Sequence, residues 1–190
     1  LCQALITCAG AASKPVVVDP KGEDYRCYRG ASIITPNRRE LGAATGAPVG
    51  TDSEIVAAGR GLIEQLDIDA LLGTRSQDGM TLISTDGRVE HLPAQAREVF
   101  DVSGAGDTVV ATLASALAKG VDLIEAAALA NIAASVVVAK SGTAVVYAAD
   151  LLHAVRAGDL TSSEAKIVPL SAALDAIEKW RLEGSKIGFT

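Results

Sequence analysis

The chain has 190 residues, of which 49% are hydrophobic and only 3% aromatic, and its formal net charge is −6 at pH 7. This acidic balance argues against binding to nucleic acid or to an anionic membrane, and the apolar runs are shorter than the ~20 residues of a membrane span. Cys2, Cys8 and Cys27 lack metal-ligand spacing. We expect reduced thiols in a cytoplasmic protein whose partner is a small molecule.

Helical segments and short apolar runs alternate in the first part of the chain. We expect helices at residues 3–12, 37–45 and 52–65, the second of them capped by Gly46. Strands are expected at residues 16–18, 32–34 and 70–74.

The middle of the chain carries a hairpin pattern. Two Asp-Gly pairs bracket an apolar run at residues 80–85, and a second run follows at residues 89–92. Helices are expected again at residues 106–119, 123–140 and 150–156. This order predicts an α/β protein, in which a doubly wound, mostly parallel sheet carries helices on both faces.

A turn of small residues lies where the helix at residues 106–119 begins. Gly104, Ala105 and Gly106 have little or no side chain, so their N–H groups can converge on an anion that the helix dipole also favours. Asp107 could accept a proton from a substrate hydroxyl while these amides stabilise a transferred phosphoryl group. The same residues also fit a plain helix start with Asp107 as its first acid. The chain has no Gly-x-x-x-x-Gly-Lys-Ser/Thr motif, which argues against a P-loop.

Two motifs resemble the ribokinase-like sugar kinase family. Residues 101–108 read DVSGAGDT, which matches the family's C-terminal signature, and residues 35–40 read TPNRRE, which matches its Asn-x-x-Glu motif. The resemblance implies that Asp107 is the catalytic base and that residues 104–106 form the anion hole. It also implies ATP and Mg²⁺ as cofactors, with Asn37 near the phosphates and Glu40 organising the magnesium hydration shell. Glu40 could equally be a solvated first-turn helix acid.

The resemblance places the nucleotide in the later part of the chain. Asn131, Lys140 and Gly142 are expected to line the adenine pocket, although Lys140 could instead be a cation at a helix C-terminus. Thr74 and Ser76 end a strand at the carboxyl edge of the sheet, where open α/β sheets bind ligands.

Four further phrases resemble the heptose 7-phosphate kinase branch of that family. They are VDPKG at residues 18–22, YRGA at 28–31, TRS with GMT at 74–81, and QAREVF at 95–100. This branch phosphorylates the anomeric hydroxyl of D-glycero-β-D-manno-heptose 7-phosphate on the route to lipopolysaccharide. Another carbohydrate or nucleoside kinase of the same fold, or a non-catalytic nucleotide-binding fragment, stays open as an alternative.

The resemblance also predicts the domain organisation. Residues 1–156 correspond to the C-terminal two-thirds of a kinase domain, residues 157–169 to a linker, and residues 170–190 to the start of a nucleotidyltransferase domain. The N-terminal part of the kinase fold, with its β-lid and most of the acceptor site, is expected to be missing. A sheet divided in this way exposes strand edges that favour a homo-oligomer.

Overall fold

The computed structural model describes residues 1–95, 102–140 and 144–161. The chain divides into two compact units, Leu1–Leu151 and Leu152–Thr190. The second unit begins within helix α6 (Ala148–Thr161), which extends beyond the end expected at residue 156. The rest of the predicted linker and the predicted nucleotidyltransferase segment lie outside the described residues. Within the described ranges, no helix is long and apolar enough to cross a membrane.

A five-stranded mixed sheet forms the centre of the first unit, and its spatial order follows the chain. The strands are β1 (Val17–Val18), β2 (Ile33–Ile34), β3 (Ala70–Thr74), β4 (Met80–Ser84) and β5 (Val89–Leu92). The first three strands are mutually parallel, whereas β4 and β5 pair antiparallel as the predicted hairpin. The expected bounds of β3 and β5 are confirmed, and the other three strands differ from prediction by one residue at one end.

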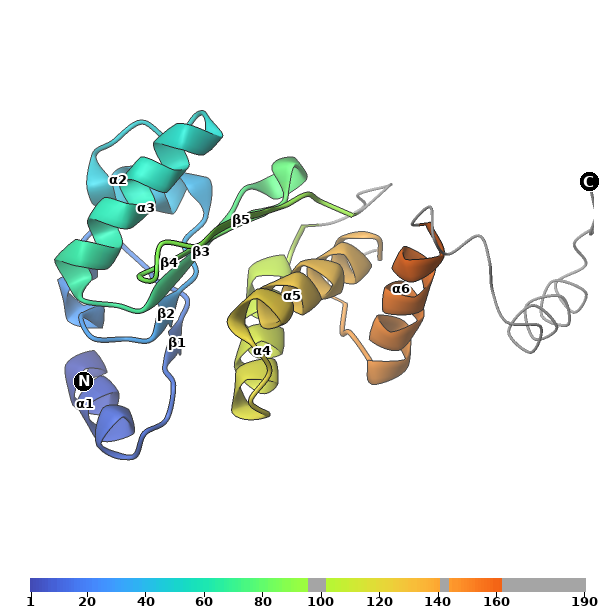
Figure 1. The fold of residues 1–190 in the computed structure, drawn as a ribbon, viewed down its shortest axis with the longest axis horizontal. Helices are drawn as coiled ribbons and strands as arrows, with labels where there is room; N and C mark the ends of the chain where they lie inside the picture. Colours follow the sequence, from blue (N-terminus) through green and yellow to red (C-terminus); the bar gives the residue numbers. More distant parts are fainter. Residues whose placement is uncertain (96–101, 141–143, 162–190) are drawn as a thin grey trace, which may run out of the picture. The chain divides into compact units, whose positions relative to one another are not determined.

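Helices cover both faces of the sheet, which confirms the predicted fold class (Figure 1). One face carries α1 (Cys2–Ala11), α2 (Arg38–Thr45) and α3 (Asp52–Leu66), and the other carries α4 (Ala105–Ala118) and α5 (Leu123–Val138). Two short 3-10 helices, η1 (Tyr25–Tyr28) and η2 (Ser76–Asp78), were not expected from the sequence pattern.

The alternation of side chains along the strands divides the core into two layers. Ile34, Leu71 and Ile83 pack with α1, α2 and α3 on one face. Ile33, Leu72 and Leu82 belong to the other cluster, with buried alanines from α5 and aliphatic residues from α4. The small side chains of α5 let it pack closely against α4, so an aliphatic core forms with few aromatic residues.

Local hydrogen bonds explain where α2 and α3 begin. Asn37 Oδ1 accepts from the Glu40 N–H at 2.9 Å, and Glu40 Oε2 accepts from the Asn37 N–H at 2.8 Å. Thr51 and Glu54 form the same reciprocal capping box at the start of α3. Gly46 ends α2 in the left-handed conformation at φ 64°, as predicted.

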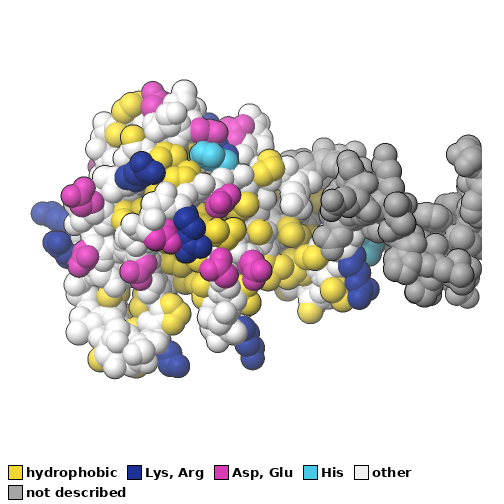
Figure 2. Space-filling model, viewed as in Figure 1, with side chains coloured by type: hydrophobic (Ala, Val, Ile, Leu, Met, Phe, Trp, Pro, Cys, Tyr) yellow, Lys and Arg dark blue, Asp and Glu magenta, His cyan; other side chains and the backbone are white. Residues whose placement is uncertain are grey.

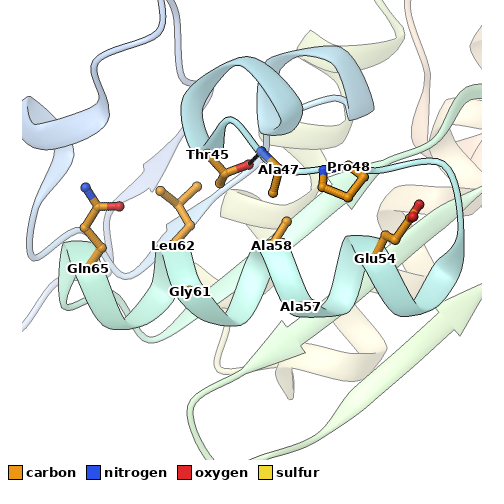
Figure 3. Close-up of a pocket in the computed structure, with 9 residues that line it drawn as sticks. All are labelled: Thr45, Ala47, Pro48, Glu54, Ala57, Ala58, Gly61, Leu62 and Gln65. Atoms are coloured by element: carbon orange, nitrogen blue, oxygen red, sulfur yellow. Dashed lines mark hydrogen bonds between the residues drawn. The ribbon is translucent and has the colours of Figure 1, made fainter.

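The described residues of the first unit form at least two hollows. The larger, of about 380 Å³, lies between α3 and the segment that ends α2, and small side chains of α3 form much of its wall (Figure 3). Its polar lining residues are partly used in local structure, because the Thr45 hydroxyl donates to the Leu41 carbonyl and Glu54 belongs to a capping box. None of the residues predicted to act on substrate lines it.

Candidate active site

The smaller hollow lies at the carboxyl ends of the three parallel strands. Asp19 follows β1, Thr35 follows β2, and Thr74 ends β3. The Thr74 N–H donates to the Pro36 carbonyl oxygen at 3.0 Å, which joins the end of β3 to the segment leading into α2. Ligands bind outside this edge in open α/β sheets. The hollow has a volume of about 220 Å³ and is lined by Asp19, Lys21, Thr35, Asn37, Glu40, Thr74, Gly104, Gly106 and Asp107.

The structure therefore brings together six of the residues selected from the sequence, from segments far apart in the chain: Asn37, Glu40, Thr74, Gly104, Gly106 and Asp107. Sequence reasoning missed Asp19, Lys21 and Thr35 as site residues. A signal was available, because each of the three lies within a few residues after a short β-branched strand, where the carboxyl edge of a parallel sheet is expected.

Glu40 makes a hydrogen bond that begins helix α2, and it also lines the hollow. Its Oε2 atom accepts the Asn37 N–H in a capping box that was not predicted from the sequence, in the first turn of α2. Its Oε1 atom lies 3.5 Å from the Lys21 ammonium, and the side chain is 23% exposed. One oxygen thus stabilises the start of α2 while the other can act on a ligand in the hollow.

Lys21 is held beside two carboxylates. Its Nζ atom lies 2.9 Å from Asp19 Oδ2 in addition to its contact with Glu40. The hydrogen bond with Asp19, followed by the charges of Asp19 and Glu40, raises the pKa of Lys21, so the side chain is a cation at neutral pH. The hollow therefore combines a positive charge with three carboxylates, since Asp107 is the third.

The glycine turn leads directly into α4. Gly104 has φ 79°, a conformation that favours glycine, and its carbonyl oxygen accepts both the N–H (3.0 Å) and the hydroxyl (2.9 Å) of Thr108. The Ala105 N–H donates to the Val102 carbonyl oxygen at 3.2 Å, and Ala105 does not line the hollow. Of the three predicted anion-hole residues, Gly104 and Gly106 therefore face the candidate site. The solvent-exposed Asp107 lies beside them in the first turn.

The residues assigned to adenine do not line this hollow. Asn131 is 5% exposed, and its Nδ2 donates to the Pro93 carbonyl oxygen at 2.8 Å, which ties α5 to the segment after β5. The Lys140 ammonium donates to Asp150 Oδ2 at 2.7 Å and to the Val145 carbonyl oxygen at 3.1 Å. Ser76 lies exposed in η2, and Gly142 lies outside the described residues. A role of these residues in nucleotide binding stays a prediction.

A buried arginine supports the strand that ends at the site. Arg75 directly follows β3 and is 6% exposed; it forms an ion pair with Asp52 of α3 and donates to the Asp78 carbonyl oxygen at 3.0 Å. Arg38 of α2 contacts the Asp78 carboxylate at 2.6 Å. These contacts link η2 to the starts of α2 and α3, and so fix Thr74 relative to the capping box. No role for Arg75 was expected from the sequence.

Acidic and basic side chains are interspersed on the face of the molecule seen in Figure 2, where magenta and dark blue atoms lie side by side.

Solved structures of two kinases share this fold. Ribokinase of Arabidopsis thaliana, complexed with ribose and ATP, superimposes with a TM-score of 0.75 at 25% identity over 82% of this chain and 52% of that one. Phosphofructokinase-2 of Escherichia coli, in complex with potassium, gives a TM-score of 0.73 at 18% identity over 82% of this chain and 51% of that one, which bears on the fold alone. The fold is thus the ribokinase-like α/β fold.

Comparison of amino-acid sequences identifies the family within this fold. Residues 1–149 match the pfkB family, and the chain belongs to this family of carbohydrate kinases. It is 60% identical over 186 residues to the bifunctional protein HldE of Paramagnetospirillum magneticum and 50% identical over 186 residues to HldE of Halorhodospira halophila. The alignments cover 98% of this chain but only 38% and 39% of these relatives. The chain therefore spans about two fifths of their length.

Proposed function

We propose that this chain is part of a kinase that transfers the γ-phosphoryl group of ATP to the anomeric hydroxyl of D-glycero-β-D-manno-heptose 7-phosphate, in the biosynthesis of ADP-heptose and lipopolysaccharide. The observation that carries the proposal is that Asp107, the glycine turn and Glu40 line one hollow at the carboxyl edge of the sheet. The identity to HldE proteins and the phrases at residues 18–22 and 28–31 support the choice of heptose among sugars. The proposed location is the cytoplasm, and self-association stays a prediction.

The proposed chemistry assigns one role to each part of the site. Asp107 accepts the proton of the anomeric hydroxyl as its oxygen forms a bond to the γ-phosphorus. The bond from that phosphorus to the bridging oxygen breaks, and ADP leaves with the electron pair. Gly104 and Gly106 line the hollow, and their amides would stabilise negative charge on the phosphoryl oxygens. Asn37 and Thr74 complete the wall on which the phosphates would lie.

The donor set of the hollow fits a hydrated magnesium ion. Asp19 Oδ2 and Glu40 Oε1 both approach the same ammonium group, so both carboxylates can reach a single cation. Among the residues that the structure describes, no cluster of three or more His, Cys, Asp or Glu side chains is placed to hold a metal. Mg²⁺ is commonly bound by one or two carboxylates, water and substrate phosphates, so these two suffice. When bound, the ion would neutralise charge on the phosphates.

The decisive experiment measures ATP turnover with heptose 7-phosphate. It compares the 190-residue chain with a form extended to the full length of its HldE relatives, each with and without Asp107→Asn. We expect Asp107→Asn to reduce turnover by on the order of 10²–10⁴-fold because the base is lost, while ATP binding persists.

Three outcomes would contradict the proposal in different ways. Turnover with a different sugar or a nucleoside would retain the kinase but replace the substrate. ATP binding without turnover in either form would indicate a nucleotide-binding protein. Unchanged turnover in Asp107→Asn would remove Asp107 from the mechanism.

A further inference from the structure

Lys21 is the one cationic side chain among the described residues that line the candidate active site. Its ammonium lies between two carboxylates, 2.9 Å from Asp19 and 3.5 Å from Glu40. Two carboxylates that converge on one point repel each other unless a cation lies between them. The ammonium supplies that cation from within the chain.

The backbone of Lys21 is fixed, but its ammonium is replaceable. The Lys21 N–H donates to the Tyr28 hydroxyl at 3.2 Å, and that hydroxyl lies 3.4 Å from the Lys21 carbonyl oxygen, to which it donates. Tyr28 packs edge-on against the buried Tyr25, with ring centroids 5.8 Å apart. The Lys21 side chain itself is 68% exposed on a flexible stem, so it can leave its partners at little cost.

We propose that Lys21 is an internal counter-ion that occupies the cation position between Asp19 and Glu40, and that a divalent cation displaces it when the cation binds. The inference rests on the proposed function in so far as that function requires a metal. Because the metal must expel a positive charge, the site binds the free ion weakly. The metal enters more favourably together with nucleotide phosphates, whose negative charge offsets the ammonium. Lys21 thereby favours the metal–nucleotide complex over the bare metal.

Binding of Mn²⁺ to the 190-residue chain without nucleotide tests the proposal, with free Mn²⁺ measured by electron paramagnetic resonance. Lys21→Met keeps an unbranched side chain but removes the charge. We expect this variant to bind Mn²⁺ on the order of threefold to tenfold more tightly, because a unit charge a few ångströms from the ion is lost in an exposed setting. Lys21→Arg keeps a cation and is the matched control, expected to bind like the unaltered chain.

Glu40→Gln assigns the signal to this site. We expect the gain of Lys21→Met to disappear in the double variant Lys21→Met/Glu40→Gln. The proposal is overturned if Lys21→Met binds Mn²⁺ no better than the unaltered chain, if neither binds it, or if the gain survives Glu40→Gln. The measurement involves no turnover, so failure to phosphorylate heptose would refute the proposed function without deciding this result.

Discussion

Replacing the exposed Asp52 should destabilise the fold more than replacing its buried partner Arg75. The Arg75 guanidinium is 6% exposed and is paired with the Asp52 carboxylate and the Asp78 carbonyl oxygen, while its Nε has no partner among the described residues. In Asp52→Ala, the positive charge stays inside the protein without its anion. An unpaired buried charge costs about 3–5 kcal/mol. Because the Asp52 side chain is 60% exposed, water reaches one side of the pair, and we expect about 2–3 kcal/mol.

Arg75→Met removes the charge that needs a partner. Methionine fills a similar elongated space, and the oxygens that it leaves behind belong to Asp52 and Asp78, which are both exposed and can bind water. We therefore expect a loss of about 1 kcal/mol, close to that of one hydrogen bond. In the double variant, adding Asp52→Ala to Arg75→Met should cost less than about 1 kcal/mol, since what is lost is an acid in the first turn of α3 and its exposed contact with His91 Nδ1 at 4.0 Å.

Urea unfolding of the 190-residue chain, followed by far-ultraviolet circular dichroism, gives the three free energies if the slopes agree. The reasoning is refuted if Arg75→Met costs as much as Asp52→Ala, or if the two losses simply add in the double variant. Either result would mean that the guanidinium is not a charge that depends on Asp52.

Two further predictions concern the turn after β3 and the segment that supports Lys21. Gly79 and Gly87 both have positive φ angles, 85° and 90°, but a Cβ at Gly79 would overlap the Leu92 carbonyl oxygen, whereas the space around Gly87 is open. In the same urea assay, Gly87→Ala should therefore lower the free energy of unfolding by about 1–2 kcal/mol, and Gly79→Ala should lower it clearly more. Equal losses for the two variants would contradict the overlap at Gly79. Hydrogen bonds from Arg26 lower the pKa of the Asp24 carboxyl group to about 2. At pH values above the ordinary pKa of 3.8, the ionised carboxylate therefore stabilises the folded state, and this stabilisation is lost as the pH falls through about 2. A carboxyl-carbon NMR titration should show this midpoint, and Arg26→Met should raise it; a midpoint near 3.8 in the unaltered chain would exclude the interaction.

Local signals explain which helices could be predicted. The starts of α2 and α3 depend on Asn37 with Glu40 and on Thr51 with Glu54, and each capping box lies within four consecutive residues. A capping box can therefore be recognised from a few consecutive residues of the sequence. By contrast, η1 forms where Tyr25 is buried against residues distant in sequence, and a segment of four residues is too short to show a periodic pattern from which to predict it.

The same distinction separates the two halves of the candidate site. Glu40, Gly104 and Asp107 belong to contiguous motifs, so they could be selected before any fold was known. Asp19 and Lys21 lie in the phrase VDPKG, from which no site role was predicted, and they come to the site because β1, β2 and β3 lie in parallel with their carboxyl ends at one edge. A site role can be assigned to such residues only when the order and direction of the strands are known.

The capping box at Asn37 and Glu40 decides how variants of Glu40 must be interpreted. Glutamine serves as well as glutamate at the third helical position of a capping box, so Glu40→Gln can keep the hydrogen bond to the Asn37 N–H while removing the negative charge. Glu40→Ala removes both and loosens the helix start that also positions Asn37. A comparison of the two variants would therefore separate the architectural role of this side chain from its proposed electrostatic one.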